Sequence, residues 1–132
     1  MKNLFLLFGL AFLCCFFSET SYSQTPITDA NFNQAISDCL STNPVDGMCT
    51  SSEYGAMPNW DVSNVTDMWE AFAFRSDFNA DLGNWDVSSV IDMDSMFAGT
   101  PFNHDIGNWD VSNVINMQLM FYFAETFDQD IG

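Results

Sequence analysis

The chain has 132 residues, of which 18 are acidic and two are Lys or Arg, giving a formal net charge of −16 at pH 7. A surface this acidic repels phosphate groups, so the composition excludes nucleic acid as a partner. Hydrophobic residues make up 48% and aromatic residues 16% of the chain. These fractions exclude a disordered acidic tail and predict a packed core.

Residues 1–23 are predicted to be a secretory signal peptide. Lys2 precedes an apolar run from Leu4 to Phe17, and small residues, Ser21 and Ser23, stand at the positions required for cleavage. The run is too short to span a bilayer. We therefore expect a secreted or cell-surface protein with no membrane insertion after signal cleavage.

The cysteines have two readings in an exported chain. Cys14 or Cys15 could carry a lipid anchor, the alternative to simple cleavage, although Leu13 stands where a lipidation site needs a small residue. After cleavage only Cys39 and Cys49 remain, and an oxidising compartment favours a disulfide between them. A metal site at this pair is the alternative, but the nearest further ligand type, a single His, lies far along the chain.

Residues 24–56 are predicted to form an N-terminal cap with a helix and the disulfide. The stretch "ITDANFNQAISDCL" gives one apolar helical face, with Thr28 or Asp29 as the N-cap. This face comprises Phe32, Ala35, Ile36, Cys39 and Leu40.

Residues 57–132 contain three repeats of 24–25 residues. The phrase "NWDVSNV" begins at Asn59, returns as "NWDVSSV" at Asn84 and recurs at Asn108. Units of this length cannot fold alone, so successive units must stack and bury like residues against like. The predicted stacking core is made of three columns: Trp60, Trp85 and Trp109; Met68, Met93 and Met117; and Phe72, Phe97 and Phe121.

Each unit is expected to combine a strand with a helical arc. Apolar residues recur every three positions from Val87 through Val90 and Met93 to Met96, which indicates an α-helical or 3-10 arc, with Ser88 as its N-cap. The opposite limb, "DLGNWDV", is short and fits a brief strand. The predicted fold is an α/β solenoid with a short parallel sheet on one side and short arcs on the other.

Three polar columns accompany the apolar ones. We expect a structural hydrogen-bonding ladder from Asn59, Asn84 and Asn108, since buried amides can satisfy the backbone of adjacent turns. Stacked carboxylates repel one another unless they are solvated, hydrogen-bonded or bridged by a cation. A calcium site is therefore the less favoured reading of Asp81, Asp105 and Asp130, against capping of the backbone or plain exposure, and the same choice applies to Asp61, Asp86 and Asp110.

The repeat resembles the unit of the BspA-like leucine-rich-repeat surface proteins, in the branch first noted in mycoplasmal lipoproteins. The segments that carry the resemblance are "FNADLGNWDVSSVIDMDSMF" and "FNHDIGNWDVSNVINMQLMF". Trp, Val, Met and Phe take the places of the usual leucines. The resemblance implies a leucine-rich-repeat-like solenoid and an exported bacterial adhesion or interaction protein without enzymatic activity.

Two functions follow from the sequence, and neither is catalytic. The chain has one His, His104, at a position that varies between units, and no phosphate-binding loop or nucleophile with its base is visible. We expect no cofactor, and we favour a non-catalytic interaction or adhesion module whose partner is an extracellular protein. The alternative is a carbohydrate-binding module, with or without calcium, if the Trp column is displayed rather than buried.

The last unit stops at Gly132, one residue before the expected Asn-Trp, which predicts a truncated chain or fragment.

Overall fold

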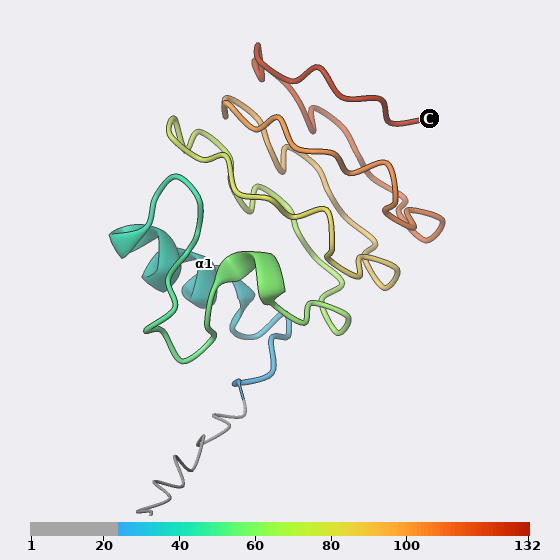
Figure 1. Ribbon diagram of the computed structural model, residues 1–132. Coiled ribbons are helices and arrows are strands. Elements are labelled where there is room, and N and C mark those ends of the chain that lie inside the picture. Colours follow the sequence, from blue (N-terminus) through green and yellow to red (C-terminus); the bar gives the residue numbers. More distant parts are fainter. Residues whose placement is uncertain (1–23) are drawn as a thin grey trace, which may run out of the picture.

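The computed structural model describes residues 24–132, so the predicted signal peptide lies outside the described residues. Two helical elements occur in this part: helix α1, Phe32–Thr42, and a single 3-10 turn, η1, Met57–Asn59. The remainder is a series of irregular coils that lie side by side, with α1 at one end and the C-terminal segment at the other (Figure 1). We name them coil 1 (57–81), coil 2 (82–105) and coil 3 (106–130).

Helix α1 forms because its apolar residues share one face. The five residues predicted for that face are all buried in α1, which confirms this element. The N-cap differs from the prediction: it is Asn31, whose side chain accepts the backbone N–H of Thr28 at 2.8 Å instead of capping the helix. Phe32 reaches Trp85 edge-on with ring centroids 6.0 Å apart, so the helix covers the near end of the coils.

The predicted disulfide between Cys39 and Cys49 is confirmed, with the two Cα atoms 5.2 Å apart. It ties α1 to the loop that leads into coil 1. Within this loop Gly47 accepts the backbone N–H of Met57 at 2.9 Å, and Val45 accepts that of Asn79 at 2.7 Å. The covalent link therefore fixes the helix against the first coil.

The coils pack like residues over like. Phe72, Phe97 and Phe121 stack with centroids 5.7 and 5.8 Å apart. A second Phe column runs beside the first, and within each coil the two rings stack face to face at about 4 Å. That second column consists of Phe78, Phe102 and Phe127.

The predicted leucine-rich-repeat solenoid with a parallel sheet is wrong. Among residues 24–132 the only strand-like pairings are isolated single-residue parallel bridges, which join Thr28 to Asn64, Asp67 to Asp92 and Asp92 to Asn116. The expected strand limb cannot extend because Asp81 bends it by accepting the N–H of Gly83. A Cβ atom on Gly83 would lie 2.7 Å from the backbone oxygen of Asp105, so the glycine permits the close approach of the next coil.

The expected helical arcs are also absent from the described residues, where the corresponding segments are successive turns. We name the segments 68–75, 93–100 and 117–124 the turn ladder. Alternate N–H groups donate to the next coil: Met68 to Asp92, Glu70 to Asp94, Phe72 to Met96 and Phe74 to Ala98, at 2.7–3.0 Å. The intervening N–H groups at 71, 73 and 75 bond three residues back within their own coil. A helix would use every N–H internally, whereas here every second one links two coils.

Positive φ angles produce this alternation. Glu70 and Phe74 have φ of 50° and 57°, and Ser95 and Gly99 take the same two places in coil 2 at 57° and 65°. Residues in the left-handed region reverse the chain direction and interrupt an α-helix. The apolar spacing of three is therefore that of repeated turns.

Candidate interaction surface

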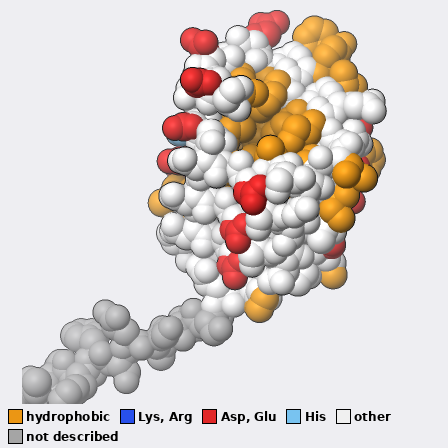
Figure 2. Space-filling view, turned by 90° about the vertical axis from the view of Figure 1, so that its right-hand side faces the viewer, with side chains coloured by type: hydrophobic (Ala, Val, Ile, Leu, Met, Phe, Trp, Pro, Cys, Tyr) orange, Lys and Arg blue, Asp and Glu red, His pale blue; other side chains and the backbone are white. Residues whose placement is uncertain are grey.

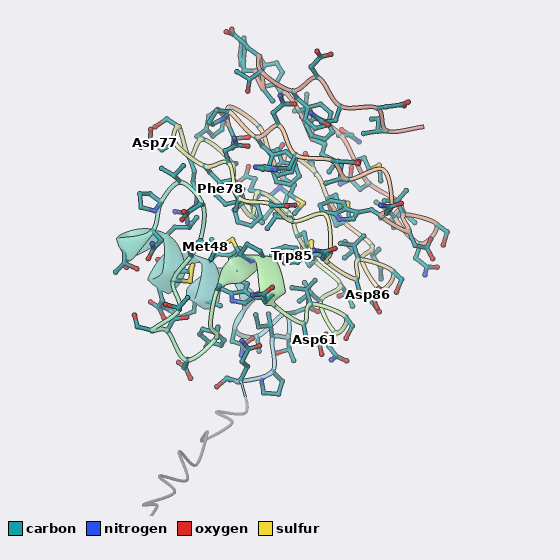
Figure 3. The ribbon with its side chains drawn as sticks, viewed as in Figure 1. Met48, Asp61, Asp77, Phe78, Trp85 and Asp86 are labelled. Carbon is teal, nitrogen blue, oxygen red and sulfur yellow. A yellow bond between two sulfur atoms is a disulfide. The ribbon has the colours of Figure 1, made fainter. Side chains whose placement is uncertain are left out.

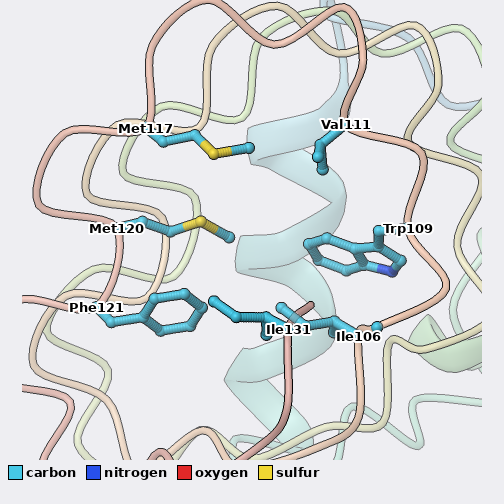
Figure 4. A pocket seen from close by; sticks show the side chains of 8 residues that line it. Ile106, Trp109, Val111, Met117, Met120, Phe121 and Ile131 are labelled. Carbon is cyan, nitrogen blue, oxygen red and sulfur yellow. The ribbon is translucent and has the colours of Figure 1, made fainter.

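The predicted stacking core is buried except for the Met and Phe of coil 3. Trp60, Trp85 and Trp109 are at most 9% exposed. In coils 1 and 2 the Met and Phe columns are fully buried, whereas Met117 is 41% exposed and Phe121 is partly buried. Phe78 and Trp85 lie inside the molecule in Figure 3. The columns thus run through the whole stack, and the Met and Phe columns lose part of their cover on coil 3 (Figure 4).

Each indole links its coil to the preceding segment. Trp85 Nε1 donates to the backbone oxygen of Met57 at 2.9 Å, and Trp109 Nε1 donates to that of Leu82 at 3.1 Å. A buried indole needs such a partner. The Trp column therefore offers no exposed row of rings for a sugar to stack on.

The polar ladder lies at a different column from the predicted one. Asn59, Asn84 and Asn108 are exposed, and their side chains make no hydrogen bond within residues 24–132. Instead Oδ1 of Asn79 accepts the N–H of Asn103 at 2.9 Å, and Oδ1 of Asn103 accepts the N–H of Asp128 at 2.9 Å. The repeated Phe-Asn pair was the sequence signal for this ladder.

The first acidic column caps turns locally. Asp61 and Asp86 lie on the same outer loop of successive coils (Figure 3). Each accepts the N–H of the serine two residues on at 3.1 Å and its hydroxyl at 2.6 Å. These bonds, the hydroxyl bond first, lower the pKa of both carboxyls below the ordinary value, and Ser112 does the same for Asp110. Ser88, predicted as a helix N-cap, is thus a donor to Asp86.

The second acidic column was the candidate calcium site. Asp81, Asp105 and Asp130 each accept the N–H of the glycine two residues on, at 3.1, 2.8 and 3.1 Å. Within residues 24–132, no three His, Cys, Asp or Glu side chains lie close enough together to hold a metal ion. The local turn accounts for the repeated Asp without a ligand.

The outer side of the turn ladder displays aromatic residues. We name Phe74, Tyr122 and Phe123 the aromatic edge; they are 69%, 48% and 63% exposed. Phe74 and Phe123 occupy equivalent positions on either side of Gly99, and the Phe74 ring lies over that glycine. Trp69, 54% exposed, lies on the same ladder in coil 1. A space-filling view from another side shows further apolar side chains above a row of acidic ones (Figure 2).

A family model described as "Mycoplasma protein of unknown function, DUF285" matches residues 43–132. The chain belongs to this family. The DUF285 region begins directly after α1 and includes all three coils, the aromatic edge and the turn-capping aspartates. It therefore starts before the first repeat predicted from the sequence, in the loop closed by the disulfide.

Membership of DUF285 does not indicate an activity, because the family is described as one of unknown function. No curated protein and no solved structure matches the chain. In the part of the chain that the structure describes, no helix combines the length and apolar character needed to cross a membrane.

Proposed function

We propose that this DUF285 protein is a secreted or cell-surface interaction module of the BspA-like kind, which binds an extracellular protein and catalyses no reaction. The aromatic edge is the observation that supports this proposal. Phe74 and Phe123 hold φ of 57° and 54° where coil 2 has Gly99. The left-handed backbone at these places belongs to the turn ladder, and it carries two exposed rings where coil 2 has no side chain.

The edge has the features of a protein-binding surface. Exposed aromatic side chains on a fixed backbone lose little conformational freedom when they are covered, and aromatic residues are enriched at interfaces. The backbone here is fixed because Phe74 donates to Ala98 and Gly99 donates to Tyr122, each at 2.7 Å. With a net charge of −16 over the chain, the complementary partner is an apolar surface with a basic rim.

The test compares a variant without the side chains of the aromatic edge with a variant that lacks other exposed apolar side chains. Labelled protein is screened against extracellular proteins and against a glycan array. The variant Phe74→Ser/Tyr122→Ser/Phe123→Ser should bind its protein partner at least about tenfold more weakly, since several buried apolar contacts are lost. The matched control, Ile91→Ser/Ile115→Ser, removes residues that are 43% and 85% exposed on the loop before the ladder and should bind normally.

Two results would decide against the proposal. Binding to glycans alone, lost in the aromatic-edge variant, would establish the carbohydrate-binding alternative. Unchanged protein binding by the aromatic-edge variant would remove the edge as the interaction surface. Circular dichroism of each variant must match that of the parent protein, which excludes unfolding as the cause of lost binding.

A further inference from the structure

The N-terminal segment of the described chain is held by the fold from Thr25 onward. Thr25 donates its N–H to the backbone oxygen of Glu53 at 3.4 Å and its hydroxyl to Oε2 of the same residue at 3.1 Å. Ile27, two residues on, is buried in the core. Figure 1 shows this segment in blue, where the described chain begins. Thr25 is therefore a fixed part of the folded domain.

Cleavage of the predicted signal peptide would make Gln24 the first residue of the protein. Ser21 and Ser23 stand at the positions that a signal peptidase requires, so the bond that is cut lies between Ser23 and Gln24. The α-amino group of Gln24 then becomes free, one residue before the anchored Thr25. The exported chain would begin with a glutamine whose main chain is fixed on one side only.

A glutamine in the first position carries a nucleophile and an electrophile in one residue. An α-amino group is partly unprotonated near neutral pH, and its nitrogen can attack Cδ of the side-chain amide to give an unstrained lactam ring. Holding both groups in one residue strongly favours this step over its bimolecular equivalent. The bond between the α-nitrogen and Cδ forms, and the bond between Cδ and Nε2 breaks. Nε2 takes the proton that the amine loses and leaves as ammonia, so no further reactant is consumed.

The structure leaves the side chain of Gln24 free to move. Gln24 is exposed, and its amide makes no hydrogen bond within residues 24–132. It borders two hollows, one of about 210 Å³ that Pro26 and Tyr54 also line, and one of about 610 Å³ that Ser52 also lines. The side chain therefore has room to fold back onto its own α-nitrogen, and an enzyme that closes the ring can approach it.

Gly55 keeps this place open. It has a φ of 67°, and a Cβ atom in its place would clash with Nε2 of Gln24. The backbone oxygen of Gly55 accepts Nε1 of Trp60 at 2.9 Å, which fixes the position of the turn. The amide of Gln24 thus lies against bare backbone and is not covered by a side chain of residue 55.

We propose that Gln24 is a modification site, at which the first residue of the exported protein closes to pyroglutamate. The product has no α-ammonium group, so Arg75 would be the one Lys or Arg charge left in a chain that is otherwise strongly acidic. It also lacks the free amine that aminopeptidases bind. This inference rests on the export that is part of the proposed function, and it is independent of the aromatic edge.

The experiment determines the first residue of the exported protein. The full chain is produced with its own residues 1–23 in a secreting bacterium, collected outside the cytoplasm, treated with a glutaminyl cyclase, and then denatured and digested with trypsin. Arg75 is the only Lys or Arg after Lys2, so the first peptide of the processed chain spans residues 24–75. We expect this peptide to be lighter than its unmodified form by one ammonia molecule, and to resist stepwise degradation from the amino end.

The matched control is Gln24→Asn. It keeps an exposed side-chain amide, but its side chain is one methylene shorter and could close only to a strained ring. The control should therefore be processed at the same bond and keep a free amine and its full mass. Loss of ammonia from the control as well would overturn the proposal, by placing the modification at another residue.

The remaining outcomes separate this inference from the proposed function. A processed chain that begins at Gln24 with a free amine after cyclase treatment would overturn the inference and leave export in place. A first residue at Cys14 or Cys15 that carries a lipid would do the same. Retention of the uncleaved chain inside the cell would overturn the inference and would also contradict the export in the proposed function.

Discussion

The repeated aspartates are best understood one residue at a time. Asp86 accepts both the N–H and the hydroxyl of Ser88, and these bonds lower its pKa, the hydroxyl contributing most. Burial and the neighbouring carboxylates Asp61 and Asp110 act in the opposite direction. The capping bonds thus outweigh the repulsion between equivalent residues of stacked coils.

This arrangement predicts a pH-dependent effect of the serine hydroxyls. A carboxyl whose pKa is lowered by folding stabilises the native state above its unfolded pKa, and that stability is lost as the pH falls through the folded pKa. The variant Ser63→Ala/Ser88→Ala removes the hydroxyl donors to Asp61 and Asp86. It should lower the Tm by a few degrees at pH 7, and the difference from the parent protein should vanish below the folded pKa values, under pH 3.8.

Thermal melts from pH 2.5 to 7 measure this difference. Taking the difference matters because protonation also relieves the repulsion among the acidic groups and stabilises both proteins alike. Ser76→Ala, at an exposed serine whose side chain makes no hydrogen bond within residues 24–132, is the control and should match the parent at every pH. A Tm difference that persists at the lowest pH would contradict the capping role.

At the scale of elements, the sequence predicted α1 and missed the turn ladder. The apolar residues from Phe32 to Leu40 recur at helical spacing, and this spacing predicts only an α-helix that buries them on one face. The spacing from Val87 to Met96 also suits a helix, but positive φ at Ser95 and Gly99 turns the segment into linked turns. A serine at positive φ leaves no mark in the sequence, so this difference could not be read from periodicity.

The candidate interaction surface, like the elements, could be predicted only in part from the sequence. The aromatic edge lies outside the sequence phrase that recurs in each unit. The exposure of Phe74, Tyr122 and Phe123 follows from the turn ladder, which the sequence did not reveal. The Asn ladder was assigned to Asn84 because that residue recurs in the longest phrase, yet recurrence alone does not distinguish an exposed residue from a bridging one such as Asn103. Only the register of the coils decides this.

The disulfide should stabilise the cap more than the coils. Cys39 and Cys49 close a short loop, with a sequence separation of 10, and such a loop contributes about 2–3 kcal/mol by restricting the unfolded chain. We expect reduction to lower the Tm while the coils stay folded, since Phe97 stacks on Phe102 and Trp109 within and between the coils. Tryptophan fluorescence during a melt with and without reductant measures the shift, and unfolded emission at 25 °C after reduction would contradict it.

At the scale of the whole molecule, charge opposes the stack that the apolar columns build. The chain carries a net charge of −16, and its carboxylates recur at equivalent places in successive coils. At 0.1 M salt the repulsion between exposed charges that lie more than about 10 Å apart is largely screened. The folded state should therefore gain stability as the ionic strength rises. Figure 2 shows acidic side chains in a row on one face of the molecule.

The effect of different salts also tests the hypothesis that the second acidic column binds calcium. We expect NaCl, MgCl₂ and CaCl₂ to raise the Tm to a similar extent at equal ionic strength, because Asp81, Asp105 and Asp130 each already bind a backbone N–H. Melts at matched ionic strength, with a chelator-treated sample as the reference, measure the three shifts. The variant Asp105→Asn keeps an oxygen acceptor for Gly107 and should leave the calcium response equal to the magnesium response. A rise specific to CaCl₂ that Asp105→Asn removes would show instead that a bound cation bridges the coils at this column.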